Sequence, residues 1–204
     1  MIKNLYKYID CKRSALHVGG CIGEERDWYD EMNFDRVIWF EPNVGLFLQL
    51  QENISVYGNQ VAVNLGIHDT LKEAVLHLAN NRGQSSSILE FGKHLKYHPK
   101  VRYIDNQVIK LVRMDDWLKS NGFDIKDFNF LNVDVQGVEL NVIKSFGDLI
   151  RQLDYVYTEV NEDYLYKNCC LVGEIDKYLL KYGFKRKITK MTPYEWGDAL
   201  YTKI

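Results

Sequence analysis

The chain has 204 residues, 46% hydrophobic and 26% charged, which is the composition of an ordinary globular protein rather than of a disordered or fibrous one. Its formal net charge of -2 argues against a nucleic-acid partner, whose phosphates call for a clustered basic face. No stretch approaches the roughly 18 apolar residues of a membrane span, and residues 1–7 lack the apolar core of a signal peptide. We therefore expect one domain over residues 1–204, with no membrane partner.

The four cysteines predict the redox compartment. Cys11 and Cys21 are isolated in the sequence, whereas Cys169 and Cys170 are adjacent. Adjacent cysteines seldom form a disulfide with each other, because the geometry of such a bond is strained. No C-x-x-C spacing occurs. Free thiols in a reduced, cytoplasmic protein are the expected state.

The first 80 residues alternate short apolar runs, rich in β-branched and aromatic residues, with longer amphipathic stretches. This alternation is typical of βα units and a mostly parallel sheet. Asn43 is a good cap for the second helix. The expected elements, in chain order, are strand 15–18, helix 24–33, strand 36–40, helix 44–53, strand 60–67 and an added strand 73–78.

Residues 80–106 interrupt this rhythm with a polar stretch that includes His94, His98 and Pro99. Long loops in compact domains are usually functional lids or substrate loops. We expect a substrate loop or lid here, and the alternative is a surface insertion without function.

Regular alternation returns after residue 106. The expected elements are strand 107–112, helix 114–120, strand 128–133, helix 138–146, strand 153–160, helix 171–182 ended by Gly183, and an antiparallel hairpin of 184–190 with 199–204. The fold class is therefore α/β and Rossmann-like, with a mostly parallel central sheet flanked by helices and a C-terminal antiparallel hairpin.

Two features at strand ends favour an adenosine-type cofactor. Gly19, Gly20 and Gly23 form a turn between the first strand and the first helix, where glycine lets the backbone approach a ligand closely. Glu41 ends the second strand, where a carboxylate can accept the hydroxyl hydrogens of a ribose. Each alone has a structural explanation, as a tight connection or an exposed glutamate, but together they favour a nucleoside.

The glycine spacing separates the possible cofactors. A dinucleotide fingerprint needs G-x-G-x-x-G, and the chain has G-G-x-x-G. No G-K-[ST] phosphate loop is present either. A nicotinamide cofactor is thus the less favoured alternative.

Several sequence blocks, spread over residues 14–203, resemble the FkbM-type methyltransferases, a subgroup of the class I methyltransferases that use S-adenosylmethionine. The most specific is Asp134-Val135-Gln136-Gly137-Val138-Glu139. The others are His17-Val18-Gly19-Gly20-Cys21-Ile22-Gly23-Glu24, Val37-Ile38-Trp39-Phe40-Glu41-Pro42-Asn43, Ser85-Ser86-Ser87-Ile88-Leu89, Tyr157-Thr158-Glu159-Val160-Asn161, Gly183-Phe184 and Trp196-Gly197-Asp198-Ala199.

The resemblance implies a class I methyltransferase fold with S-adenosylmethionine as the cofactor. The turn from Gly19 to Gly23 would hold the methionine part, and Glu41, followed by Pro42, the ribose. Asp69 would lie near the adenine, unless it is simply a turn residue. Described members of the family methylate hydroxyl oxygens, often on sugars or natural products, which implies O-methyl transfer here.

One position departs from the family pattern. His17 stands where the family usually has an acidic residue that helps hold the positively charged methionine end of the cofactor. A neutral imidazole offers no charge, so Asp134 or Glu24 would have to supply it. The alternative is a core histidine hydrogen-bonded to the backbone.

An alcohol acceptor benefits from a base that removes its proton as the oxygen attacks. Asp134, Glu159 and Asn161 follow the later strands and are the expected catalytic residues, with Asp134 or Glu159 as the base. Each carboxylate has a structural alternative as a cap, and the three together have oxygen ligands for a divalent ion, although no metal site is predicted. Further candidates are Glu139, His94 and His98 as bases, and 85–87 as hydrogen-bonding residues for the acceptor.

The sequence thus predicts a methyltransferase that acts on a hydroxyl of a sugar or small natural product. The alternative is a catalytically inactive methyltransferase fold that acts as a binding module. The expected partner is a small-molecule or glycan acceptor, and a homodimer is possible. The acceptor itself is not specified by the sequence.

Overall fold

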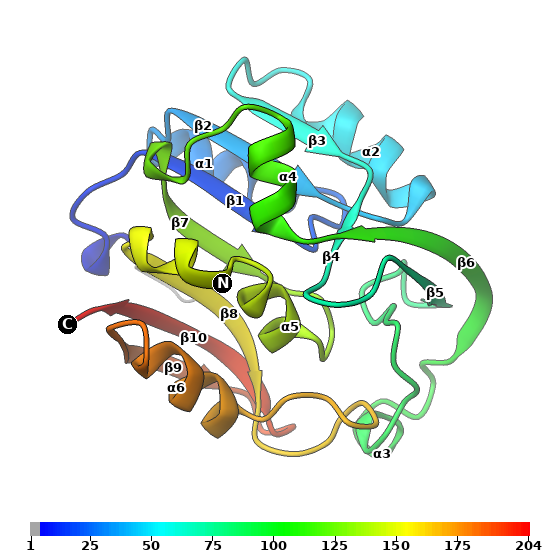
Figure 1. Ribbon diagram of the computed structural model, residues 1–204. Helices are drawn as coiled ribbons and strands as arrows, with labels where there is room; N and C mark the ends of the chain where they lie inside the picture. Colours follow the sequence, from blue (N-terminus) through cyan, green and yellow to red (C-terminus); the bar gives the residue numbers. More distant parts are fainter. Residues whose placement is uncertain (1–4) are drawn as a thin grey trace.

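The computed structural model describes residues 5–204, and a seven-stranded sheet forms its centre (Figure 1). The strands are β1 (Ser14–Val18), β2 (Arg36–Phe40), β3 (Gln60–Val63), β7 (Phe128–Val133), β8 (Tyr155–Asn161), β9 (Phe184–Met191) and β10 (Trp196–Lys203). Their order across the sheet is β3-β2-β1-β7-β8-β10-β9. β1 is parallel to both of its neighbours, β2 and β7. Strand order therefore reverses at β1, where open α/β sheets bind their ligands.

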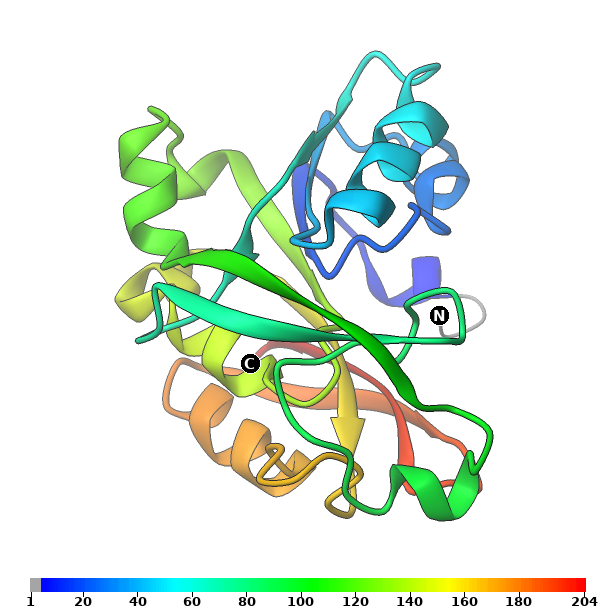
Figure 2. The same cartoon turned by 90° about the vertical axis from the view of Figure 1, so that its right-hand side faces the viewer.

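Helices cover both faces of this sheet. The helices of the described chain are α1 (Arg26–Glu31), α2 (Val44–Ile54), α4 (Met114–Ser120), α5 (Glu139–Lys144) and α6 (Val172–Leu180), and α3 (His94–Tyr97) in the segment between β5 and β6. There are also 3-10 turns η1 (Leu5–Tyr8), η2 (Ile125–Asp127) and η3 (Gly147–Gln152). α4, α5 and α6 pack on one face, and α1 and α2 on the other (Figure 2). As expected, Asn43 caps α2, because its side chain accepts hydrogen bonds from two backbone N–H groups of the first turn.

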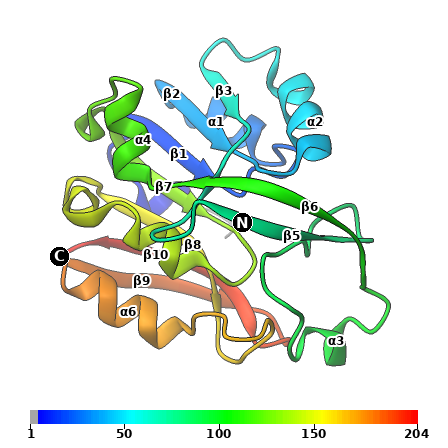
Figure 3. The same ribbon diagram turned by 45° about the vertical axis from the view of Figure 1, so that its right-hand side comes forward.

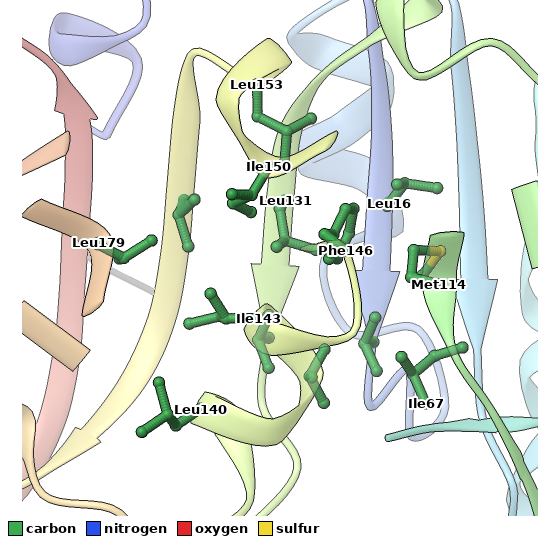
Figure 4. Close-up of a cluster of buried hydrophobic side chains, with 14 of the residues drawn as sticks. Leu16, Ile67, Met114, Leu131, Leu140, Ile143, Phe146, Ile150, Leu153 and Leu179 are labelled. Carbon is green, nitrogen blue, oxygen red and sulfur yellow. The ribbon is translucent and has the colours of Figure 1, made fainter. Parts of the chain in front are cut away.

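Strand alternation divides the core between the two faces. Leu16 and Leu131 point toward α4, α5 and α6, where they meet Ile143 and Phe146 (Figure 4). Their neighbours along the strands point the other way, so that Ala15 packs with the aromatic cluster around α1 and α2. Every residue of β1, β7 and β8 is buried. Burial on both faces explains why apolar residues dominate these strands without regular polar alternation.

The single strand predicted over residues 60–67 is wrong, because the chain breaks after Val63. The Asn64 side chain donates to the carbonyl oxygens of Glu41 and Pro42, at 2.8 and 3.1 Å. The pairing of β3 with β2 ends one residue earlier, at Val63. The chain then enters a second sheet of three strands, in the order β4-β6-β5. These strands are β4 (Gly66–Ile67), β5 (Glu73–Ala79) and β6 (Tyr103–Val112).

The loop predicted over residues 80–106 is shorter than expected, since β6 begins at Tyr103. The segment between β5 and β6, with α3 inside it, lies beyond the carboxyl ends of the central strands (Figure 3). It is held there by three backbone hydrogen bonds of 2.8–3.0 Å, from residues 92–94 to Tyr164 and Leu165. This segment is therefore packed against the loop after β8 and covers the end of the sheet.

The predicted C-terminal hairpin is confirmed: β9 pairs antiparallel with β10, which pairs antiparallel with β8. β10 begins at Trp196, three residues before the expected start, because the pairing continues to Asn161. The mostly parallel sheet between helices confirms the expected fold class.

The four cysteines are free. Within residues 5–204, no helix has the length and apolar character needed to cross a membrane.

Candidate cofactor and acceptor site

A cavity of about 530 Å³ opens where strand order reverses. Its wall is formed by the ends of β1, β2, β7, β8 and β10 and by the segment between β5 and β6. The predicted site residues that line it are His17, Gly19, Gly20, Glu41, Pro42, Asp134 and Glu159. Those that do not line it are Gly23, Asp69 and Asn161.

The glycine turn forms the floor of the cavity next to β1. Gly19 has φ +91°, and a Cβ on it would lie 1.7 Å from the carbonyl oxygen of Asp134. The N–H groups of Gly19 and Gly20 donate to the carbonyl oxygen of Phe40, at 2.9 and 3.0 Å. The turn is thus held between the ends of β2 and β7, and only glycine allows this approach.

Gly23 has a packing role instead. A Cβ there would lie 2.8 Å from a methyl group of Leu50, so the absent side chain lets the turn rest on α2. The structure does not bring Gly23 to the cavity wall.

Glu41 is the best-placed residue for a ribose. Its two carboxylate oxygens accept the N–H groups of Cys21 and Asn43, each at 2.8 Å. The side chain is 6% exposed, and burial raises its pKa to about 7, although the two N–H donors work in the opposite direction. A carboxylate held in place by the backbone is ready to accept ligand hydroxyls from the cavity.

His17 is a packed core side chain with one edge at the cavity. Its Nδ1 lies 3.1 Å from the hydroxyl of Tyr29 and 3.3 Å from the amide nitrogen of Asn132, and its ring stacks on Trp39 with centroids 4.2 Å apart. Burial lowers its pKa to about 3, while a hydrogen bond to the Gly19 backbone opposes this shift. The imidazole is therefore neutral, so that His17 brings no charge to the cavity.

Other acidic residues line the cavity beside His17. Glu24, Glu25 and Asp134 all line the cavity. Burial, together with repulsion from Asp134, raises the pKa of Glu25 to about 7. Glu25 was not among the residues predicted from the sequence, since it lies in the irregular turn before α1, where no periodicity assigns it a direction.

Asp134 and Glu159 meet through the side chain of Gln136. The Gln136 amide nitrogen donates to Asp134 at 2.6 Å and to Glu159 at 3.1 Å. Burial of the carboxyl group raises the pKa of Asp134 to about 6, although the residue as a whole is exposed and lines the cavity. Burial and the charge of Asp134 raise the pKa of Glu159 well above its usual range. Asp198 of β10, opposite Glu159 in the register, adds a third carboxyl group to this wall.

Glu139, a further candidate base, lies below the cavity rather than on its wall. Its Oε1 accepts the N–H groups of Gly137 at 2.8 Å and Val135 at 3.3 Å, and Cys170 Sγ lies 3.5 Å from Oε2. The side chain is fully buried. Its role is to hold the turn between β7 and α5, and the structure does not support the expectation of a base.

Asp69 and Asn161 were expected at the site, and the structure places both elsewhere. Asp69 accepts a hydrogen bond from Asn141 of α5 at 2.9 Å and lies beside His68, so it does not reach the cavity. Asn161 is fully buried, and neither polar atom of its side chain has a hydrogen-bond partner.

No three His, Cys, Asp or Glu side chains within residues 5–204 are arranged to hold a metal ion.

The segment between β5 and β6 adds a polar wall. Ser85 Oγ lies 3.1 Å from His94 Nε2, and both residues line the cavity together with His98. Burial lowers the pKa of His94 to about 4, which makes it a weak base. Ser87 donates to the backbone carbonyl of Gln136 at 2.7 Å and so ties this segment to the loop after β7.

The order of the strands, the glycine turn after β1 and the acidic residue after β2 define a class I methyltransferase. The model of the methyltransferase FkbM domain matches residues 17–186. The chain belongs to the FkbM methyltransferase family.

Solved structures show the same fold at low sequence identity. A putative tRNA (m1A22) methyltransferase from Streptococcus pneumoniae, in complex with S-adenosyl-L-methionine, matches with a TM-score of 0.54 and 8% identity over 97% of this chain and 69% of its own. The magnesium protoporphyrin IX methyltransferase from Synechocystis PCC 6803, with bound SAM, has a TM-score of 0.51 and 9% identity, with 95% and 71% covered. The putative methyltransferase yhhF from Escherichia coli has a TM-score of 0.54 and 12% identity, with 98% and 82% covered.

A curated relative is the 2-O-methyltransferase NoeI of Sinorhizobium fredii, which is 26% identical over 134 residues. The match covers 63% of this chain and 54% of NoeI, so the chain spans about half the length of this relative.

The cofactor of this family and fold is S-adenosylmethionine, and the cavity fits it. The approach of the Gly19 backbone leaves a cradle that a Cβ would fill. Glu41 presents a fixed acceptor for ribose hydroxyls, and the carboxyl groups around Asp134 suit a sulfonium and an ammonium charge. When bound, the cofactor supplies an electrophilic methyl group.

Proposed function

We propose that this protein is an O-methyltransferase that acts on a hydroxyl of a sugar or small natural product. The observation that carries this proposal is that one cavity is lined both by Glu41, the candidate ribose ligand, and by the carboxyl pair Asp134 and Glu159. The similarity to a 2-O-methyltransferase favours oxygen as the acceptor atom.

The charge of the cavity favours an acceptor without phosphate or carboxylate groups. Its lining contains no lysine or arginine within residues 5–204. Anionic substrates are normally met by such side chains. The carboxyl groups that line it are Glu24, Glu25, Glu41, Asp134, Glu159 and Asp198.

The protein has two tasks in methyl transfer to an alcohol. It would align the acceptor oxygen with the methyl carbon and exclude water, and the segment between β5 and β6 lines the cavity where this would occur. It would also take up the hydroxyl proton: a carboxylate of the cavity would accept this proton as the acceptor oxygen bonds to the methyl group that the cofactor would supply. Asp134 is exposed to the cavity and is the candidate for this proton.

Replacement of the usual acidic residue by His17 favours a second candidate, an inactive fold that binds the nucleoside without transfer. Isothermal titration of the folded protein with S-adenosylmethionine, followed by an acceptor screen with methyl-labelled cofactor, tests both. We expect binding, and label transfer to neutral polyhydroxylated acceptors rather than to their phosphorylated forms.

The outcomes separate the candidates. Folded protein that gives no heat of binding contradicts the enzyme and the nucleoside-binding module alike. Binding without transfer to any hydroxyl acceptor favours the module, and transfer mainly to phosphorylated acceptors contradicts the inference from charge.

A further inference from the structure

The side chain of Gln136 lies between the two carboxyl groups of the cavity. One amide nitrogen donates to both, at 2.6 Å to Asp134 Oδ1 and 3.1 Å to Glu159 Oε2. Gln136 has φ +59°, a conformation that is costly for a side chain of this type. Strained residues persist where the surroundings over-determine them, often at functional sites.

The orientation of the Gln136 side-chain amide is set by the hydrogen bond that its oxygen, Oε1, accepts. The hydroxyl of Tyr166 donates to Gln136 Oε1 at 2.6 Å, and Tyr166 is itself 1% exposed. Because Oε1 accepts this proton, the amide nitrogen must face the carboxyl groups. Ser87 fixes the backbone of Gln136 from the opposite wall, at 2.7 Å. The donor is therefore preorganised before any acceptor binds.

The two carboxyl groups differ in their surroundings. Glu159 is 6% exposed and faces Asp134, Asp198 and the buried Glu139. Asp134 is exposed to the cavity and faces Glu24 and Asp198. No lysine or arginine of the described chain lines the cavity to offset these charges. Neighbouring carboxylates cannot all ionise, and the more buried one retains its proton.

We propose that Gln136 is a positioning residue that divides the roles of this pair: Glu159 holds a proton, and Asp134 is kept ionised as the base that receives the acceptor proton. This inference rests on the proposed function, because that function identifies the group that gives its proton to Asp134 as the hydroxyl of the acceptor. Two amide hydrogens serve two carboxyl groups, and the shorter contact goes to the one that stays charged.

The test is a carbon-detected NMR titration of the side-chain carboxyl groups in ligand-free protein, assigned with Asp134→Asn and Glu159→Gln. In the wild type we expect Asp134 to titrate at lower pH than Glu159. In Gln136→Leu the apparent pKa of Asp134 should rise by about 1, a tenfold change in proton affinity, because its donor is lost. Tyr166→Phe should shift it in the same direction by less.

Glu73, an exposed carboxyl group on β5, is the internal control and should keep its titration midpoint. If Gln136→Leu does not fold, Gln136→Asn serves instead, since asparagine tolerates positive φ but is too short to bridge both groups. A wild type in which Glu159 titrates first, or a folded variant with an unchanged Asp134 midpoint, would overturn the assignment. The titration needs no cofactor, so a failure to bind S-adenosylmethionine contradicts the proposed function separately.

Discussion

At the scale of single residues, Glu41 at the end of β2 is the candidate ribose ligand. Glu41 is already bound by two backbone N–H groups, so it loses little conformational freedom when a ligand arrives. The N–H donors themselves come from the glycine turn and from the residue that caps α2. Binding and local fold therefore depend on the same carboxylate.

Replacement of Glu41 by alanine should weaken the binding of S-adenosylmethionine by about 1–3 kcal/mol, the cost of leaving buried hydrogen-bonding groups unpaired. Isothermal titration measures this effect, and Glu52→Ala, on the exposed side of α2, is the matched control. Equal affinity in the wild type and Glu41→Ala would mean that Glu41 does not hold the ribose.

At the scale of elements, the turn from β7 to α5 positions the candidate catalytic residue Asp134. Asp134 and Gln136 face the cavity from this turn, while Glu139 holds its backbone from below. The Asp-Val-Gln-Gly-x-Glu block thus combines two tasks: its first half contacts the ligand space and its last residue maintains the shape.

Glu139→Ala should lower the free energy of unfolding by about 1–3 kcal/mol, because the N–H groups of Val135 and Gly137 lose a buried acceptor. Glu139→Gln keeps one acceptor oxygen and should cost less. Urea unfolding checks both against Glu73→Ala, whose side chain is exposed. A cost of Glu139→Ala no larger than that of the control would contradict the structural role.

At the scale of the whole molecule, several carboxyl groups in and below the cavity are buried on folding, and burial favours their neutral form. Burial raises the pKa of Glu41 and Glu139 to about 7 and that of Glu159 well above its usual range. Burial acts oppositely on His17 and His94, whose pKa values fall to about 3 and 4. The pH dependence of stability therefore has two opposing parts.

The sign of each part follows from linkage. A carboxyl with a raised folded-state pKa stabilises fully below its unfolded value near 4.5, and this contribution is lost as pH rises through the folded value. The histidines stabilise above their unfolded value of 6.5 and lose this contribution as pH falls toward 3 or 4. Above pH 6.5 the contribution of the two histidines to the free energy of unfolding is constant, and only the contribution of the carboxyl groups still changes with pH.

We therefore expect the ligand-free protein to lose stability between about pH 6.5 and 8. One carboxyl that titrates fully contributes about 1.4 kcal/mol per pH unit. Urea unfolding across this range measures the slope. Glu159→Gln should flatten it, whereas Glu73→Gln, at an exposed position, should leave it unchanged. A stability that rises with pH in this window would contradict the assignment of neutral buried carboxyl groups.

Much of the fold could be predicted from local pattern. The apolar runs at 15–18 and 128–133 lie in central strands because burial on both faces removes polar alternation. Asn43 caps α2 through its own side chain, a contact within three residues. The break at Asn64 has no local sequence signal, because it depends on carbonyl groups more than 20 residues away.

For the site, the sequence by itself determined that the candidate ligand-binding residues follow strand ends, and Gly19, Glu41 and Asp134 do lie on the cavity wall. Only the tertiary structure decided which neighbours point into it. α5 draws Asp69 away through Asn141, the end of β8 buries Asn161, and the turn before α1 brings in Glu25. The physical reason is distance along the chain: backbone periodicity is set by neighbouring residues, whereas the direction of a side chain after a strand is set by contacts with elements far away in the sequence.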